Sequence, residues 1–383
     1  MSSSEETIFV QIASYRDADL PNTIRSALNN AKNPENLSFG ICWQYDDLTY
    51  TDLDPYLTDS RFRIAQYYYE ESRGCCWARN ITNSLYQGEK YTLQIDAHTR
   101  FAPDWDAKYK KMFAEVDSDK PLFSTYPAPF TTVNGIDRLV LDRGIQKLTL
   151  GKIRKNLTTV LKTIPVETED ICVPSQYIAA GQIFTLGQFC DEVEYDPGLY
   201  FDGEEISLAS RAYTSGYDFF CPNKDLIWHW YKHTMPLHWS DHQSEHDKAA
   251  MKRLGKLLLG QHSELGKYGL GNVRSLAQFE QYIGVDLTKR TQRKDVPTHF
   301  RESIELDVSQ IPDRNDYVYW IFTLKNIDEK EIYRFDINDE RILNKTIRRV
   351  DLDLHLEDIP TAYSLWPYVH SDGYLTQHHR QLK

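Results

Sequence analysis

The chain has 383 residues, of which 41% are hydrophobic and 13% aromatic, and its formal net charge is -12. This composition can form a large core, so it excludes a disordered chain, and the length is too great for one ordinary domain. The acidic balance excludes a general nucleic-acid-binding or anionic-membrane-binding surface, because either would need a basic face.

The compartment is predicted from the first residues and the cysteines. The sequence begins with a polar, acidic segment, and no apolar run reaches the roughly 20 residues that span a bilayer. Six cysteines include no Cys-x-x-Cys pair, which is typical of reduced core thiols. We therefore expect a cytoplasmic protein without a membrane span.

From residue 7 onward, short β-rich runs alternate with helical runs, which indicates an α/β fold with a mostly parallel sheet flanked by helices. We predict strands at 8–14, 37–44, 62–69, 91–96, 121–125, 218–221 and 226–228. We predict helices at 20–31, 76–85, 105–116, 204–215 and 244–259. The pattern weakens between 126 and 173, where we expect loops and short helices that frame a site. Runs at 317–323 and 331–336 predict antiparallel strands in a separate β-rich region.

The segment Tyr91-Thr-Leu-Gln-Ile-Asp-Ala-His98 is an apolar strand that ends on two candidate metal ligands, Asp96 and His98. Two such ligands one residue apart, both projecting beyond the sheet edge, are well placed to hold a divalent cation. The alternative is an Asp that starts a turn while His98 lies on the surface.

A second motif precedes this strand by about twenty residues. Glu71-Ser-Arg-Gly-Cys-Cys-Trp-Ala-Arg-Asn80 is a glycine-containing loop that enters a helix and carries Arg79 on the first turns. In a parallel sheet this helix start lies beside the crevice where nucleotides bind, and a guanidinium suits a diphosphate. Arg79 is thus a candidate phosphate or base clamp, and a structural ion pair is the alternative.

In this order of strands, loops and motifs, the chain resembles the GT-A glycosyltransferases, in which a DXD motif holds Mn²⁺ or Mg²⁺ against the diphosphate of a nucleotide sugar. The Asp-x-His variant is shared with the polypeptide N-acetylgalactosaminyltransferases. The strongest likeness is to glycosyltransferase family 60, the polypeptide hydroxyproline α-N-acetylglucosaminyltransferases. It covers roughly residues 7 to 287 and leaves the C-terminal part outside. The matching segments are Ile12-Ala-Ser-Tyr-Arg-Asp17, Ala179-Ala-Gly181, Phe201-Asp-Gly-Glu-Glu205, Trp228-His-Trp-Tyr231 and Gly269-Leu-Gly-Asn-Val-Arg-Ser275.

The resemblance implies catalytic roles for two carboxylates and one arginine. Glu204 would bind the donor sugar, Glu205 would lie on the sugar or acceptor side, and Arg79 would share the charge of the departing phosphate. The alternative for two acids at a helix start is a favourable interaction with the helix dipole.

A third metal ligand is implied at His229, which would complete the set with Asp96 and His98. Two nitrogens and one carboxylate suit Mn²⁺ somewhat better than Mg²⁺. His233 and His238 are nearby competitors for this role.

The remaining site residues are predicted to surround the donor. Gly181 would let the backbone approach the sugar, although a turn glycine is the plainer interpretation. Residues 232–239 are a candidate mobile loop over the donor. The candidates for the uridine, at the ends of the first two strands, are Ser14, Tyr15 and Arg16, with Trp43 and Gln44 as weaker ones.

We therefore expect a GT-A catalytic domain at 1–290 and a β-rich accessory domain at 297–383, for acceptor capture or dimerisation. The expected reaction is metal-dependent, retaining transfer of N-acetylglucosamine from UDP-GlcNAc to a protein hydroxyl on Ser, Thr or hydroxyproline. One alternative is a saccharide acceptor in surface-polysaccharide synthesis, and another is an inactive sugar-nucleotide-binding module. The oligomeric state is left open.

Overall fold

The computed structural model describes residues 6–50, 52–141, 143–166, 172–241, 245–292, 298–327, 329–356 and 359–382. The chain divides into two compact units, 1–292 and 293–383, each with its own core. Among the described residues, no helix combines the length and the apolar character needed to cross a bilayer.

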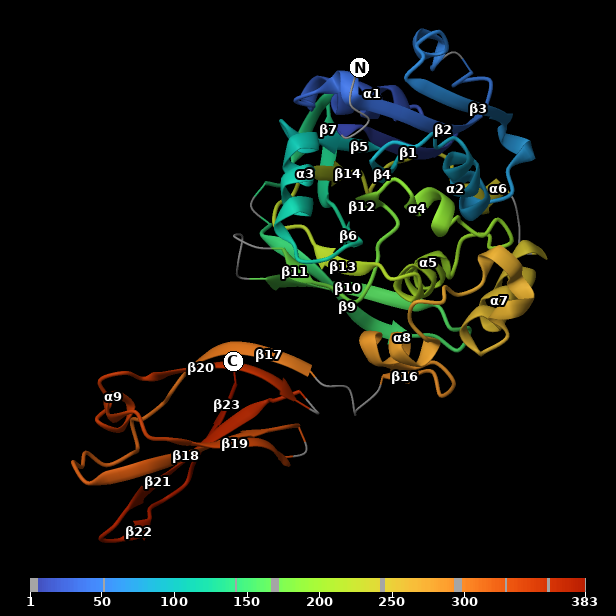
Figure 1. Cartoon of the computed structure of the whole chain (residues 1–383). Helices are drawn as coiled ribbons and strands as arrows, with labels where there is room; N and C mark the ends of the chain where they lie inside the picture. Colours follow the sequence, from blue (N-terminus) through green and yellow to red (C-terminus); the bar gives the residue numbers. More distant parts are fainter. Residues whose placement is uncertain are drawn as a thin grey trace. The chain divides into compact units, whose positions relative to one another are not determined.

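The first unit is built around an eight-stranded sheet with the strand order β11-β13-β6-β12-β4-β1-β2-β3 (Figure 1). Neighbours β3, β2, β1 and β4 are parallel, as are β6 and β13, while the other pairs are antiparallel. The strands are β1 (Ile8–Tyr15), β2 (Leu37–Tyr45), β3 (Phe62–Tyr68), β4 (Tyr91–Asp96), β6 (Pro121–Ser124), β11 (Val173–Pro174), β12 (Gln182–Leu186) and β13 (Asp218–Cys221). The predicted α/β sheet is therefore confirmed.

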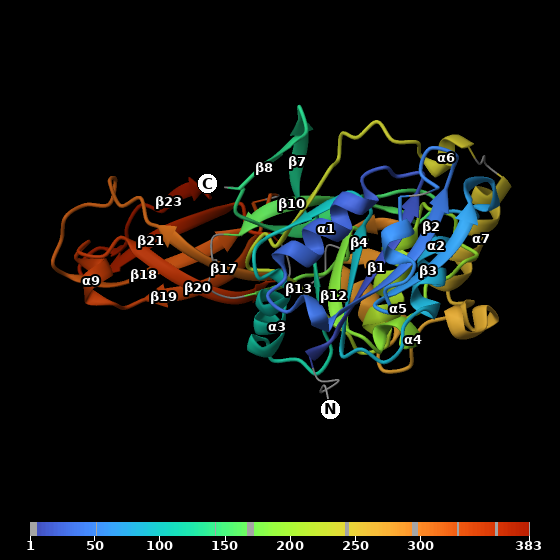
Figure 2. The ribbon, with the colours of Figure 1, turned by 90° about the horizontal axis from the view of Figure 1, so that it is seen from above.

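Helices cover both faces of this sheet (Figure 2). On one face α1 (Leu20–Asn30) and α3 (Trp105–Glu115) pack against the apolar side chains of β1, β2 and β4. The other helices of this unit are α2 (Cys75–Ser84), α4 (Phe189–Glu192), α5 (Glu204–Thr214), α6 (His238–Asp241), α7 (Glu245–Leu258) and α8 (Leu276–Ile283). Helix α1 shows why the pattern was readable: its buried residues Leu20, Thr23, Ile24 and Ala27 follow helical spacing.

Most predicted elements agree with the structure. In the first unit, the ends of the predicted strands and of the five predicted helices differ from the observed ones by one residue at most, and residue 244 lies outside the described residues. In the second unit, the strand predicted at 317–323 extends two residues further, to Lys325. A second, four-stranded sheet begins just after β4 in the chain. Its strands, in spatial order, are β5 (Thr99–Phe101), β14 (Ile227–His229), β7 (Ala128–Val133) and β8 (Ile136–Leu139).

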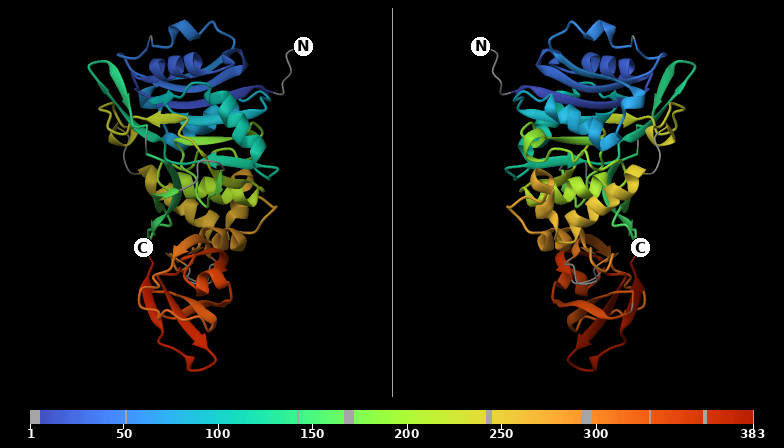
Figure 3. Two further views of the ribbon diagram at one scale, coloured as in Figure 1. Left: turned by 90° about the vertical axis from the view of Figure 1, so that its left-hand side faces the viewer. Right: turned by 90° about the vertical axis from the view of Figure 1, so that its right-hand side faces the viewer.

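The prediction of loops and short helices between 126 and 173 was wrong. Two β-hairpins occupy this region, β7–β8 and the pair β9 (Ile145–Ile153) and β10 (Thr159–Val166). The β7–β8 turn has φ of 51° at Asn134 and 74° at Gly135, the positive values that a two-residue hairpin turn requires. This hairpin projects from its unit (Figure 2 and Figure 3), and every β8 side chain is exposed.

The second unit is β-rich. Its five-stranded sheet contains β18 (Tyr317–Lys325), β19 (Glu331–Ile337), β21 (Ala362–Val369), β22 (Gly373–Tyr374) and β23 (His378–Gln381). Strands β18 and β19 are antiparallel, as predicted. A pair of strands, β17 (Thr298–Glu305) and β20 (Arg349–Leu356), and the short helix α9 (Glu340–Leu343) complete this unit. In the first unit, β15 (Val285–Asp286) pairs with β16 (Thr291–Gln292).

Candidate functional site

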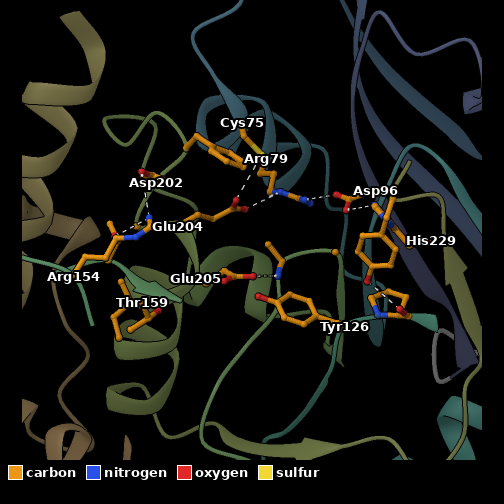
Figure 4. A pocket seen from close by; sticks show the side chains of 18 residues that line it. Cys75, Arg79, Asp96, Tyr126, Arg154, Thr159, Asp202, Glu204, Glu205 and His229 are labelled. Carbon is orange, nitrogen blue, oxygen red and sulfur yellow. Dashed lines mark hydrogen bonds and ion pairs between the residues drawn. The ribbon is translucent and has the colours of Figure 1, made fainter. Parts of the chain in front are cut away.

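A cavity of about 340 Å³ opens at the carboxyl end of β4 (Figure 4). Its walls come from the first turns of α2 and α5, the end of β14, the segment before β12 and the β9–β10 hairpin. Of the predicted site residues, the cavity brings together Arg79, Asp96, Gly181, Glu204, Glu205 and His229.

The Arg79 guanidinium lies between two carboxylates. Its Nη2 donates a hydrogen bond to Asp96 Oδ1 at 2.7 Å, and its Nε lies 2.9 Å from Glu204 Oε1 in an ion pair whose angle does not make a hydrogen bond. Arg79 is only 4% exposed, so it holds α2, β4 and α5 together. The structure thus shows an ion-paired arginine, the alternative left open by the sequence.

A glycine sets the start of the helix that carries Arg79. Gly74 has φ of 98°, and a Cβ at this position would lie 2.4 Å from Tyr200 Cδ2. Only glycine combines this backbone conformation with so close a neighbour. Gly74 therefore determines where α2 begins and aims Arg79 at Asp96.

Asp96, His98 and His229 place one ligand atom each within 4.8 Å of one another. His229 Nε2 lies 3.1 Å from Asp96 Oδ2, and the His98 and His229 ring centroids are 4.6 Å apart. Within the part of the chain that the structure describes, this is the one group with metal-ligand geometry. Two imidazoles and a carboxylate fit a divalent transition metal such as Mn²⁺.

The charge on Asp96 is stabilised by its neighbours. Burial alone would raise the pKa of Asp96, but the His229 hydrogen bond and the Arg79 charge outweigh it and hold that pKa well below its usual range. Asp96 is therefore a carboxylate at any ordinary pH, as a metal ligand must be.

The two other candidates for the third metal ligand, His233 and His238, lie in different surroundings. The His233 ring centroid is 4.3 Å from that of His98, close to the three-residue group but not part of it. His238 lies among the rings of Tyr15, Tyr200 and Phe201, with centroid distances between 5.2 and 6.0 Å. These positions favour His229 as the third ligand.

Glu204 and Glu205 begin α5 after Gly203, whose φ is 88°. Burial raises the pKa of Glu204, although Arg79 opposes the shift. Burial, and then the charge of Glu204, raise the pKa of Glu205 to about 8, while its Oε1 accepts a hydrogen bond from the Ala180 backbone N–H at 3.3 Å. Glu205 can therefore carry a proton near neutral pH.

Gly181 is close to Asp96. A Cβ on Gly181 would lie 2.8 Å from Asp96 Oδ2, nearer than side-chain atoms normally approach a Cβ. The group that this backbone approaches in the structure is thus the Asp96 carboxylate, and its approach to a donor sugar stays a prediction.

The five residues predicted for the uridine do not line the cavity. Trp43 and Gln44 are buried, and Gln44 Nε2 donates to the Ser14 carbonyl at 3.0 Å. Tyr15 and Arg16 both donate to Asp241 Oδ2 of α6, at 2.7 and 2.9 Å. Their contact with a donor base stays a prediction.

Sequence reasoning missed the side of the cavity that the β9–β10 hairpin forms. This hairpin supplies Arg154, Thr158 and Thr159, and Arg154 Nη1 lies 3.8 Å from Asp202 Oδ2. Tyr126 and Tyr231 complete the wall near His229. The signal for the hairpin was the β-branched run 158–160 followed by alternation through 166.

Comparisons with known proteins agree on the kind of fold. A family model described as Glycosyltransferase (GlcNAc) matches residues 7–60 and 47–289. A crystal structure of GalNAc-T7 with UDP, GalNAc and Mn²⁺ is similar at a TM-score of 0.53 and 14% identity, over 98% of this chain and 69% of that one. At this identity the likeness shows the fold alone, and it confirms the expected GT-A architecture.

A more distant likeness is to S. aureus TarS 1-349 in complex with UDP-GlcNAc. Its TM-score is 0.45 at 13% identity, over 73% of this chain and 70% of that one, which is too low to carry an argument. No curated protein matches the chain.

The contact between Gly181 and Asp96 yields a first prediction. Gly181→Ala should lower the free energy of unfolding by about 1–3 kcal/mol, because the new methyl group displaces the Asp96 carboxylate from Arg79. Urea denaturation measures this. Gly255→Ala in α7 is the control, since a Cβ there meets nothing within 4 Å, and it should be neutral or stabilising. Equal effects of the two changes would contradict the close contact.

The raised pKa of Glu205 yields a second prediction. In the folded chain Glu205 keeps its proton up to about pH 8, whereas in the unfolded chain it loses the proton near the ordinary pKa of a glutamate. The wild-type fold therefore loses stability as the pH rises between these two pKa values. Glu205→Gln should therefore gain stability over the wild type between pH 5 and 8, on the order of 1 kcal/mol per pKa unit. Unfolding midpoints at several pH values measure this gain. Glu35→Gln controls for the lost charge, because Glu35 is an exposed carboxylate in the segment between α1 and β2. A pH-independent difference in stability between Glu205→Gln and the wild type would argue against the raised pKa.

Proposed function

The chain belongs to the glycosyltransferase (GlcNAc) family, and from this premise we propose that it transfers N-acetylglucosamine from UDP-GlcNAc to an acceptor hydroxyl, with retention of anomeric configuration. The proposal includes membership of the glycosyltransferase family 60 group and a protein hydroxyl as acceptor. The observation that carries it is the convergence of Asp96, His98 and His229 beside a cavity whose lining includes Asp96, His229 and the two glutamates Glu204 and Glu205.

The donor diphosphate would lie at the metal-ligand end of the cavity. Mn²⁺ held by Asp96, His98 and His229 would neutralise the charge of the departing diphosphate. The residues support this placement, because a permanently ionised Asp96 and two imidazoles form a donor set suited to that ion.

Arg79 serves as a positioning residue in this proposal. Both of its close partners are carboxylates, and its 4% exposure leaves little guanidinium surface for a phosphate. It would instead keep Asp96 aimed at the metal and Glu204 aimed into the cavity, which is the preorganisation that electrostatic catalysis needs.

The two glutamates would contact the sugar from the start of α5. Glu204 would accept hydrogen bonds from donor-sugar hydroxyls, and Glu205, whose pKa of about 8 keeps it protonated near neutrality, would also be able to donate one. Neither is assigned as a covalent nucleophile. The leaving phosphate would accept the proton of the attacking hydroxyl.

A panel of UDP- and GDP-sugars tests the donor. We expect Mn²⁺-dependent hydrolysis or transfer with UDP-GlcNAc and little with UDP-GalNAc, UDP-glucose or GDP-sugars. Preference for another sugar would correct the donor, and the absence of turnover with every member would overturn the proposal in favour of a binding module. Peptide and oligosaccharide acceptors in the same assay would separate a protein acceptor from a saccharide one.

Replacement of a metal ligand yields a third prediction. Asp96→Asn should lower Mn²⁺-dependent UDP release by about 10²–10³-fold, because the amide is a weaker ligand and removes one of the two carboxylate charges beside Arg79. The release of UDP is measured by a coupled assay, with far-UV circular dichroism to confirm folding. His229→Gln should give a comparable loss without touching Arg79. Full turnover in either folded variant would contradict the metal site.

A further inference from the structure

A carboxylate outside the cavity contacts one of the three candidate ligands. Asp17, in the turn between β1 and α1, places its Oδ2 2.7 Å from His98 Nδ1. Asp17 is 6% exposed and does not line the cavity. It therefore acts on the site only through the imidazole of His98.

Both oxygens of Asp17 are engaged. While Oδ2 faces His98, Oδ1 accepts a hydrogen bond from the Asp19 backbone N–H at 2.9 Å. A carboxylate can only accept hydrogen bonds, so the proton in the contact between the two side chains lies on His98 Nδ1. The other ring nitrogen, Nε2, is then the atom with a lone pair for a ligand.

The same turn and the first turns of α1 hold the chain on both sides of His98. Thr23 Oγ1 donates to the Ala97 carbonyl at 2.6 Å and accepts from the Thr99 N–H at 2.8 Å. The buried Arg100 makes two hydrogen bonds to Asp19, at 2.7 and 2.8 Å. The backbone of the Asp96-Ala-His98 corner is thus also held at 97 and 99 by Thr23, and Arg100 is held by Asp19. In this corner, the His98 ring is the part that Asp17 contacts through its own side chain.

We propose that Asp17 is a positioning residue that sets the tautomer and ring orientation of His98, so that Nε2 is presented unprotonated toward Asp96 and His229 for a divalent cation. This inference rests on the proposed function for the identity of the ion. Carboxylates that accept from the second nitrogen of a metal-binding histidine typically change metal affinity by about 10–100-fold when replaced.

Two substitutions separate this role from simple packing. In Asp17→Asn, the one remaining side-chain oxygen would keep the hydrogen bond from the Asp19 N–H, and the amide nitrogen would face His98 Nδ1. Because an amide nitrogen can only donate a hydrogen bond, Nδ1 would have to accept it. The ring proton would then lie on Nε2. In Asp17→Ala neither tautomer is favoured. We therefore expect Mn²⁺ affinity to fall by about 10–100-fold in Asp17→Asn and by less in Asp17→Ala. A packing role predicts the reverse order, because alanine removes more of the side chain.

The affinity is measured on the full chain, without donor, from the electron paramagnetic resonance signal of free Mn²⁺. Asp106→Asn is the matched control: Asp106 is 1% exposed and accepts from the N–H groups of Lys32 and Asn33 at 2.7 and 3.0 Å. It should lose stability and keep its Mn²⁺ affinity. If the wild type binds Mn²⁺ and Asp17→Asn binds it as tightly, or more tightly than Asp17→Ala, the inference is overturned while the proposed function stands.

A second measurement does not need the metal. At a pH high enough for a single ring proton on His98, the ¹⁵N spectrum of this residue should show a protonated Nδ1 in the wild type and a protonated Nε2 in Asp17→Asn. The same tautomer in both chains would overturn the inference. If instead the wild type failed to bind Mn²⁺ but the tautomers changed as expected, the proposed function would fail and the contact would stand.

Discussion

A buried guanidinium that joins two carboxylates is the interaction on which the rest of the site depends. Arg79 lies 2.7 Å from Asp96 and 2.9 Å from Glu204 and is 4% exposed. Removing one member of a buried ion pair typically costs about 3–5 kcal/mol, because a charge is left without compensation. This one side chain therefore ties α2 to the end of β4 and to the start of α5, and it places the candidate metal ligand Asp96 and the sugar-binding candidate Glu204 on facing walls of one cavity.

Asp96 is where several constraints meet. One of its oxygens accepts from Arg79, the other faces His229, and Gly181 approaches without a side chain. The neighbouring His98 is oriented by Asp17 from the turn before α1. Residues from five separate stretches of the chain thus define a carboxylate that remains ionised and an imidazole pair beside it, which explains how a short Asp-x-His motif becomes a three-dimensional site.

Much of this could be predicted from the sequence. The central strands are short, almost continuously buried apolar runs, the helices have helical spacing, and Asp96, His98 and Glu204 stand at or next to element ends. The β9–β10 hairpin was not, since β9 buries only Ile145 and Leu148 and shows no period-two burial. Its other positions include the polar residues Gln146, Lys147 and Lys152, which are typical of a loop. Long-range pairings were also out of reach. Arg79 could be placed on α2, but whether it faced a phosphate or two carboxylates depended on side chains that only folding brings together.

The central claim is that Asp96, His98 and His229 hold a divalent cation that binds the donor diphosphate. Crystals grown with Mn²⁺ and UDP and measured at the manganese absorption edge test it most directly. The account predicts one anomalous peak within coordination distance, about 2.0–2.4 Å, of a ligand atom from each of the three residues and adjacent to the phosphates. UDP bound in the cavity with no peak there, or a peak coordinated by other residues, would contradict it.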